Sequence, residues 1–379
     1  KPKPVSMEKL KKQGCVADGL LSEYNPDREE YISLINRSNC YYLHRAVETW
    51  LTPPDFDTIG YVMSRLTKKD IVYGMFIAEA INPNAVYYDP ERGVNFNFQS
   101  MCKDGSYDFG GPGTCIANFR SPEYKRYLDY ITKKAVDMGI ETFLFGQVNF
   151  QDSRFLFDYE ADEIVSDIRD YASSINRTVV IGAQTGDIGS QGYLKNFDYI
   201  EGGVGLHADG TTIESGPCYS LWWKKKGDRC WPMLWNEKFS SKANNVVIHL
   251  DWSGLAYDDM SKFARMDKET RTKALKNLYQ YYTSRNVGFI MPFTAVLYTQ
   301  NGGCFGPKPD LYSADNKYSC QDEDVTNAIL SGNYQLNESD FVAQSVYPIM
   351  VAGERYQVSV TMRNSGLLAW TNEKLYRLG

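Results

Sequence analysis

Residues 121–149, SPEYKRYLDYITKKAVDMGIETFLFGQVN, contain one complete helix-to-strand unit and decide the fold class. The tripeptide Ser121–Glu123 is typical of a helix start, because proline and acidic side chains suit the first turn, where backbone amides are unpaired. Apolar side chains then recur at helical spacing up to Gly139, which is placed to end the helix. A connection of only a few residues leads to the apolar run Thr142–Asn149, which predicts a buried strand.

The same alternation of apolar runs and amphipathic stretches repeats between Cys15 and Gly332. Most of the runs are too continuous to be half-exposed, which is typical of parallel strands that are covered on both faces. The eight expected strands are Cys15–Leu21, Cys40–Thr49, Ile71–Ala80, Thr142–Asn149, Thr178–Gln184, Asp198–Gly205, Asn245–Trp252 and Val287–Leu297. Eight strand-and-helix units predict an α/β protein with a (β/α)8 TIM barrel over residues 14–340.

Further helices are expected between these strands. Two have proline and aspartate at their start, and two are long amphipathic stretches. They begin at Pro26-Asp27 and at Pro53-Pro54-Asp55, or extend over Ala161–Ile175 and Ser261–Arg285.

The connections differ in length according to the end of the strand that they join. Those that lead from a helix back to a strand are short, whereas three that leave strands are long: Asn82–Arg120, Leu206–Asn244 and Tyr298–Gln321. Long loops therefore gather at the carboxyl ends of the strands, where barrel enzymes carry their chemistry.

The eight cysteines favour an exported protein with disulfide bonds. Taken in order along the chain they form four local pairs, and three of these pairs fall inside the long loops, where a crosslink contributes about 3 kcal/mol. The pairs are Cys15 with Cys40, Cys102 with Cys115, Cys218 with Cys230, and Cys304 with Cys320. Other pairings, and reduced core thiols in a cytosolic protein, remain open.

Composition excludes several classes of partner. The net charge of -6 and the scattered lysines predict no nucleic-acid partner, and no apolar run reaches the length of a membrane span. Neither phosphate-binding glycine motif is present, so no cofactor is expected. The histidines, His44, His207 and His249, occur without a metal-binding spacing, and there is no C-x2-C pair, so we expect no metal site. The oligomeric state is left open.

Acidic side chains follow or lie within most of the expected strands. Of these, Glu79, Glu201 and Asp251 are the candidate catalytic residues. Glu79 and Asp251 have apolar neighbours that would desolvate them and raise the carboxyl pKa toward the range of a general acid. Two glycines after Glu201 would let a ligand approach closely. For any one of them, a helix cap or a salt bridge is the alternative.

Polar and aromatic side chains at the same strand ends are candidate sugar contacts, because amides and carboxylates bind hydroxyl groups and indole rings stack on sugar rings. The candidate substrate-binding residues are Glu48, Trp50, Gln147, Asn149, Gln184, His207, Trp222 and Trp252. Trp222 belongs to a tryptophan-rich loop that could instead form a small core of its own.

In architecture and residue types the barrel resembles TIM-barrel glycoside hydrolases over roughly 320 residues. The resemblance implies a poly- or oligosaccharide substrate and catalysis by two carboxyl groups. The sequence departs from the large retaining clan, which has Asn-Glu after strand four and Glu at strand seven, because Gln147 and Asp251 occupy those places. A secreted or surface protein that binds carbohydrate without cleaving it is the alternative.

The two ends of the chain differ from the barrel. Residues 1–13 are expected to form a linker, and residues 341–379 a β-rich extension. Val351–Tyr356, Val358–Gly366 and Trp370 resemble the opening strands of an immunoglobulin-like module of bacterial secreted proteins. Only the first part of such a module is covered, so a truncated module and a separate β-extension both fit.

Overall fold

The computed structural model describes residues 4–22, 28–152, 160–184, 194–206, 243–252, 258–296, 304, 311–317, 320–332, 339–365 and 370. The chain divides into two compact units, Lys1–Leu330 and Ser331–Gly379, each treated below by itself.

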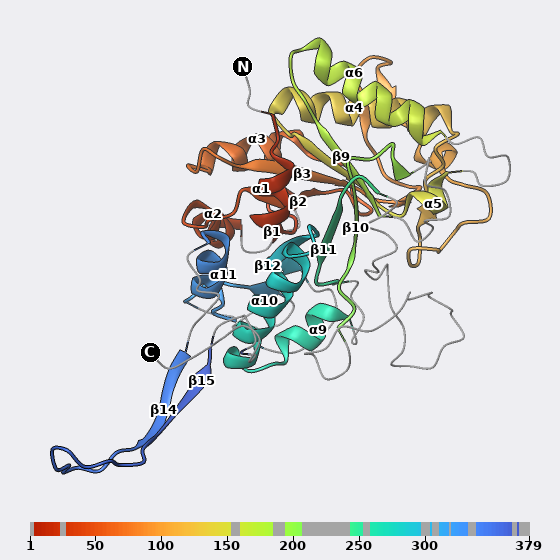
Figure 1. The fold of residues 1–379 in the computed structure, drawn as a ribbon. Coiled ribbons are helices and arrows are strands. Elements are labelled where there is room, and N and C mark those ends of the chain that lie inside the picture. The colour runs from red at the N-terminus through yellow and green to blue at the C-terminus, as the bar shows by residue number, and fades with distance from the viewer. Residues whose placement is uncertain are drawn as a thin grey trace. The chain divides into compact units, whose positions relative to one another are not determined.

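The first unit is built on a closed barrel of eight parallel strands (Figure 1). Neighbours pair in chain order, and β1 also pairs with β12, which closes the barrel. The strands are β1 (Gly14–Ala17), β2 (Tyr42–Glu48), β3 (Val72–Ile77), β8 (Thr142–Phe145), β9 (Val180–Gln184), β10 (Tyr199–Gly203), β11 (Val246–His249) and β12 (Gly288–Val296). The prediction of a (β/α)8 barrel is confirmed.

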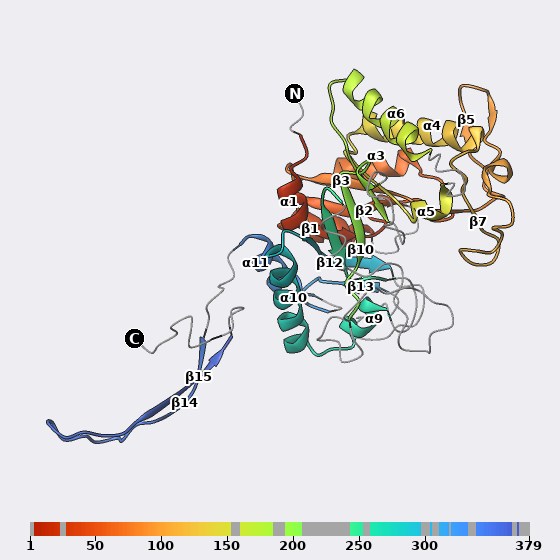
Figure 2. The same cartoon turned by 45° about the vertical axis from the view of Figure 1, so that its right-hand side comes forward.

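Helices lie outside the strands (Figure 2). They are α2 (Arg28–Asn36), α3 (Phe56–Arg65), α4 (Pro122–Met138), α6 (Ala161–Ser174), α9 (Asp259–Ala264), α10 (Lys268–Thr283) and α11 (Glu323–Leu330). The predicted ends of α4 are confirmed: the Ser121 side chain accepts from the amide of Tyr124, and Gly139 has a left-handed backbone with φ 95°.

The prediction of one long helix over Ser261–Arg285 is wrong. Two helices occupy this stretch, because Asp267 has an extended backbone and its side chain accepts from the amide of Thr270, so that it starts α10 afresh. The hydrophobic spacing continued across the break and concealed it.

A short helix, α1 (Met7–Lys12), lies within the expected linker 1–13. Lys11 is buried and its Nζ donates to Oδ1 of Asn286 (2.7 Å) and of Asn245 (3.1 Å), just before β12 and β11. Residues 7–12 are therefore part of the barrel unit. Next to them, Gln13 Nε2 donates to the carbonyl of Leu330 (3.2 Å), where this unit ends.

Large and small side chains alternate inside the barrel. The hydroxyls of Tyr42 and Tyr199 meet across it at 3.3 Å. Glycines make room for both rings: a Cβ at Gly182 would lie 2.2 Å from the ring of Tyr199, and a Cβ at Gly74 would lie 2.9 Å from the hydroxyl of Tyr42. Such interdigitation fills the interior of a small barrel.

The long connection after β3 carries short elements: β4 (Ala80–Ile81), β5 (Tyr88–Asp89), β6 (Val94–Asn95), η1 (Phe98–Met101) and β7 (Cys115–Ile116). Helix α5 (Val148–Gln151) follows β8, and β13 (Leu311–Ser313) pairs antiparallel with β12. The disulfides Cys15–Cys40, Cys102–Cys115 and Cys304–Cys320 are confirmed. Cys218 and Cys230 lie outside the described residues.

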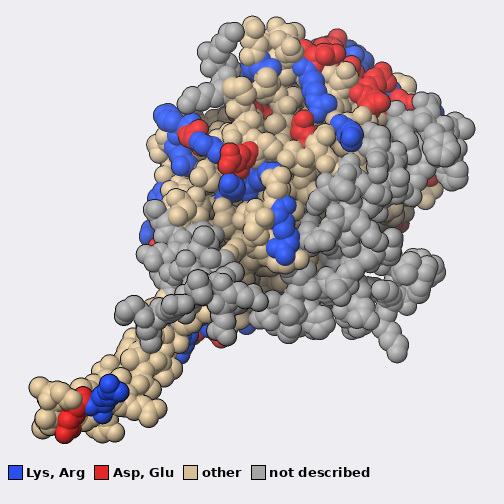
Figure 3. Space-filling model, in the orientation of Figure 1, with Lys and Arg blue, Asp and Glu red and all other residues tan. Residues whose placement is uncertain are grey.

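The second unit contains a two-stranded antiparallel sheet of β14 (Ser339–Ser345) and β15 (Ser359–Asn364). Strand β15 lies within the expected extension 341–379, and β14 begins two residues before it. Its likeness to an immunoglobulin-like module stays a prediction. On the face drawn in Figure 3, basic and acidic side chains of the molecule lie in small mixed groups. None of the described helices has the length and apolar character of a membrane span.

Candidate active site

Polar side chains gather where the parallel strands end. They share deep burial, each being between 2% and 6% exposed: Asp18, Glu48, Glu79, Gln147, Gln184, Asp251 and Trp252. These residues come from or follow β1, β2, β3, β8, β9 and β11. Buried carboxylates at the carboxyl end of a barrel mark the place where barrel enzymes have their active sites, which makes this cluster the candidate site.

Glu79 follows β3 and is held from the neighbouring strand end. Its Oε1 accepts from Gln147 Nε2 (3.1 Å), whereas its Oε2 has no hydrogen-bond partner among the described residues. Oε2 lies against Gly146, where a Cβ would be 2.1 Å away. Burial raises the pKa of the Glu79 carboxyl above its ordinary value. The group is therefore suited to carry a proton that it can give away.

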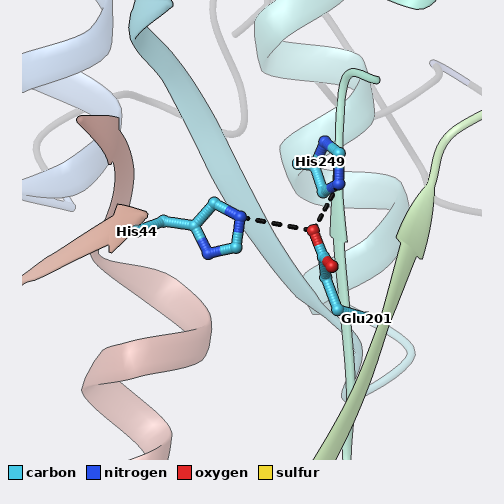
Figure 4. Close-up of side chains that lie close together, drawn as sticks. All are labelled: His44, Glu201 and His249. Carbon is cyan, nitrogen blue, oxygen red and sulfur yellow. Dashed lines mark ion pairs between the residues drawn. The ribbon is translucent and has the colours of Figure 1, made fainter. Parts of the chain in front are cut away.

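Glu201, in the middle of β10, is completely buried and surrounded by nitrogen atoms (Figure 4). Its Oε2 accepts from Gln184 Nε2 (2.6 Å). Its Oε1 faces His44 Nε2 at 3.2 Å and also pairs with His249 Nε2. Burial alone would raise its pKa, but the two histidines hold the pKa of Glu201 well below the ordinary value.

The two histidines have different surroundings. His249 Nδ1 lies 3.0 Å from the carbonyl oxygen of Leu250, and because a carbonyl only accepts, this nitrogen carries the hydrogen. His44 Nδ1 lies 3.2 Å from the hydroxyl of Tyr42. Burial lowers the pKa of His44 to about 4, whereas the carboxylate of Glu201 outweighs burial and raises the pKa of His249 to about 8.

Arg45 brings a positive charge to the same end of the barrel. Its backbone has φ 55°, at an irregularity between β2 and β3, and its guanidinium lies over the rings of Phe76 (3.8 Å) and Trp252 (4.9 Å). Arg45 Nε donates to Glu48 Oε2 (2.8 Å). Burial nevertheless raises the pKa of Glu48 to about 7. Asp18 Oδ2 accepts from Trp252 Nε1 (3.1 Å), so Trp252 is fixed on two sides.

Asp251 is positioned through its backbone. Its amide donates to Oδ2 of Asp259 (3.1 Å), the first residue of α9. The carboxylate of Asp259 also accepts from the amides of Gly205 (3.0 Å) and Leu206 (2.7 Å). One buried side chain thus ties the ends of β10 and β11 together.

The structure brings two pairs of predicted residues into direct contact: Glu79 with Gln147, and Glu201 with Gln184. Trp252 and Glu48 are linked indirectly, because both contact the guanidinium of Arg45. Trp50 is half-buried, and its amide donates to Glu48 Oε1 (2.9 Å). The side chain of Asn149, which lies in α5, and residues His207 and Trp222 fall outside the described residues.

Sequence reasoning missed four residues of this site: His44, His249, Arg45 and Asp259. The histidines were set aside because they lack a metal-binding spacing, yet β2 and β11 direct both at Glu201. A signal did exist, since each histidine occupies a buried position in a strand where a polar side chain needs a partner.

No protein-family model matches this chain, and no curated protein matches it. Solved structures that match include an α-amylase from Anoxybacillus, with 12% identity and a TM-score of 0.45 over 80% of this chain and 68% of that one. A γ-CGTase from alkalophilic Bacillus clarkii has 13% identity and a TM-score of 0.43, over 79% and 46%. A β-L-arabinopyranosidase from Geobacillus stearothermophilus has 14% identity and a TM-score of 0.26, over 38% and 32%. This chain covers 32% and 55% of the lengths of two structures of that arabinopyranosidase.

Proposed function

We propose that the protein is a secreted glycoside hydrolase that cleaves a poly- or oligosaccharide at the carboxyl end of the barrel. The observation that carries the proposal is Glu79, a buried carboxyl group with a raised pKa, one oxygen held by Gln147 and the other without a hydrogen-bond partner among the described residues. A protonated carboxyl group is what the leaving oxygen of a glycosidic bond requires.

Glycoside hydrolysis also needs an ionised carboxylate that attacks the sugar or activates water. Asp251 is our candidate for this group, because it follows β11 on the same edge of the barrel and its backbone is fixed by Asp259. Glu201, the third candidate catalytic residue, has a carboxylate that is enclosed by Gln184, His44 and His249. In this scheme it orients those three side chains and does not act on the sugar.

Sugar rings and hydroxyl groups would meet the remaining side chains. Trp252 offers an indole held by Asp18, and Glu48, Gln147 and Gln184 offer hydrogen bonds. Trp50, Asn149, His207 and Trp222 are further proposed contacts. The three disulfides of the described residues support an extracellular protein.

The test is release of reducing sugar from a panel of polysaccharides by the wild type, Glu79→Gln and Asp251→Asn. We expect each substitution to lower kcat by about 100-fold or more, because general acid–base catalysis contributes at least that much. The kcat/KM of the wild type should fall as pH rises through the raised pKa of Glu79, since the acid must be protonated. The residual activity of Glu79→Gln should lack this fall.

A matched control is Glu123→Gln, which changes an acidic side chain that pairs with Arg92 on the outside of the barrel, at the start of α4. It should keep the wild-type rate, and circular dichroism should show that all variants are folded. Full activity in a folded Glu79→Gln protein would contradict the proposed acid.

A non-catalytic carbohydrate-binding protein is the second candidate. The observation that favours it is that Asp18, Glu48 and Glu201 all accept hydrogen bonds or ion pairs from neighbouring side chains. Binding of glycans by calorimetry without cleavage of any substrate in the panel would support this function instead.

A further inference from the structure

Three nitrogen and oxygen atoms converge at one point inside the barrel (Figure 4). His44 Nε2, Glu201 Oε1 and His249 Nε2 belong to side chains that are at most 1% exposed, and the ligand atoms of the cluster lie within 4.8 Å of one another. None of the three atoms has a hydrogen bond of acceptable geometry to the described residues. They face one another as the ion pairs described above without forming hydrogen bonds, and buried polar atoms are nearly always hydrogen-bonded, so an ion between them is a candidate partner.

The outer atoms of the same side chains, in contrast, are all held. His249 Nδ1 donates to the carbonyl of Leu250 (3.0 Å), and Glu201 Oε2 accepts from Gln184 (2.6 Å). His44 Nδ1 is 3.2 Å from the hydroxyl of Tyr42. Metal-binding histidines are oriented in this way, with one ring nitrogen fixed by an oxygen atom and the lone pair of the other directed at the ion.

We propose that His44, Glu201 and His249 bind a zinc ion. Imidazole nitrogen and carboxylate oxygen are ordinary zinc ligands. The 3.2 Å between His44 Nε2 and Glu201 Oε1 matches the edge of about 3.3 Å in a tetrahedron whose corners lie about 2.0 Å from the metal. All three ligand atoms lie within 4.8 Å of one another, so movements of the side chains bring the other two pairs toward the same spacing, and water can take the fourth position.

The site joins three strands across the barrel, because the ligands come from β2, β10 and β11. Their burial shields the ion from bulk solvent and from a polysaccharide, so the water in the fourth position would be enclosed in the barrel. An ion enclosed in this way stabilises the barrel interior and enters as the chain folds. This inference does not depend on the proposed hydrolase activity.

The first test is metal analysis of the full chain, produced with zinc in the medium and purified without a chelator. We expect about one zinc per chain, as in a structural site formed on folding. Protein that is unfolded, stripped with a chelator and refolded should have a lower Tm, which zinc added during refolding restores. A chain that is free of metal as purified, and whose Tm is the same when it is refolded with or without zinc, would overturn the proposal.

Variants locate the site. His44→Ala and His249→Ala should lose the zinc, whereas His207→Ala, which changes the remaining histidine of the chain, should keep it. If the first two variants do not fold, the metal site is tested instead in the wild type, which is refolded with cobalt and examined by absorption spectroscopy. A visible absorption band of four-coordinate cobalt supports the site, and refolded protein without bound cobalt rejects it. These readouts are independent of sugar cleavage.

Discussion

Gly146 lies where no other residue fits beside Glu79. A Cβ at this position would be 2.1 Å from Glu79 Oε2, 2.8 Å from the ring of Phe76 and 3.1 Å from the amide nitrogen of Glu79. The two closest contacts are to buried side chains, so an added Cβ would push aside the carboxyl group of Glu79 and the ring of Phe76. The absence of a side chain at Gly146 therefore leaves the space that the carboxyl group of Glu79 occupies.

Gly146→Ala should displace this carboxyl group. We expect kcat to fall about tenfold or more, because small misplacements of a catalytic group are costly, and the free energy of unfolding to fall by about 1–3 kcal/mol. Sugar release and urea unfolding measure the two effects. The matched control is Gly60→Ala in α3, where the nearest atom is the flexible Met138 Cε at 3.2 Å. This change should leave kcat unchanged and stabilise the helix by about 0.5–1 kcal/mol.

The sequence was informative about single residues where a strand ends in an acid. Glu79 and Asp251 could be predicted as buried, because their neighbours along the chain are apolar. The ion pairs of Glu201 with His44 and His249 could not be predicted from the sequence. Their members are separated by 157 and 48 positions, as their numbers show, and only the closure of the barrel brings them together.

At the scale of elements, α9 matters more than its six residues suggest. Its first residue, Asp259, accepts hydrogen bonds from three backbone amides at the ends of β10 and β11. Sequence patterning could not reveal this, because the apolar spacing predicted one long helix over Ser261–Arg285, which begins after Asp259. The acceptors of a buried amide are set by the tertiary fold rather than by periodicity.

Asp259→Ala should leave those three amides without their acceptor. We expect the free energy of unfolding to fall by about 3 kcal/mol or more, since each buried donor left unpaired costs about 1–3 kcal/mol. Urea unfolding gives the value. Asp55→Ala removes another aspartate, the N-cap of α3, and should cost only about 1 kcal/mol. Equal losses in the two variants would show that Asp259 is an ordinary helix cap.

Closure of the barrel depends on a contact between its first and last parallel strands. Cys15 in β1 pairs with Met291 in β12, so the barrel closes only when nearly the entire unit is ordered. Contacts of such sequence separation are costly to form and make folding slow. The number and order of the strands could be predicted from the apolar runs. Their exact ends could not, because burial continues into the loops, as at Leu20 and Leu21 after β1.

The disulfides should ease this problem by restricting the unfolded chain. Cys15–Cys40 spans 25 positions and Cys102–Cys115 spans 13, which corresponds to about 3 kcal/mol for each crosslink. Replacing both cysteines of one pair with serine should therefore lower the free energy of unfolding by about that amount. Urea unfolding with and without a reducing agent measures it. A wild type whose unfolding midpoint is insensitive to reduction would contradict this role.

The hydrogen bond from Gln13 to the carbonyl of Leu330 brings the last residue of the first unit next to the residue that precedes β1. Both points are at the amino ends of the strands, whereas Glu79 and Asp251 lie at the carboxyl ends. A reporter protein fused at either point, or a bead that anchors the unit there, would be on the back of the barrel. An immobilised form of this unit would keep the carboxyl ends of its strands open.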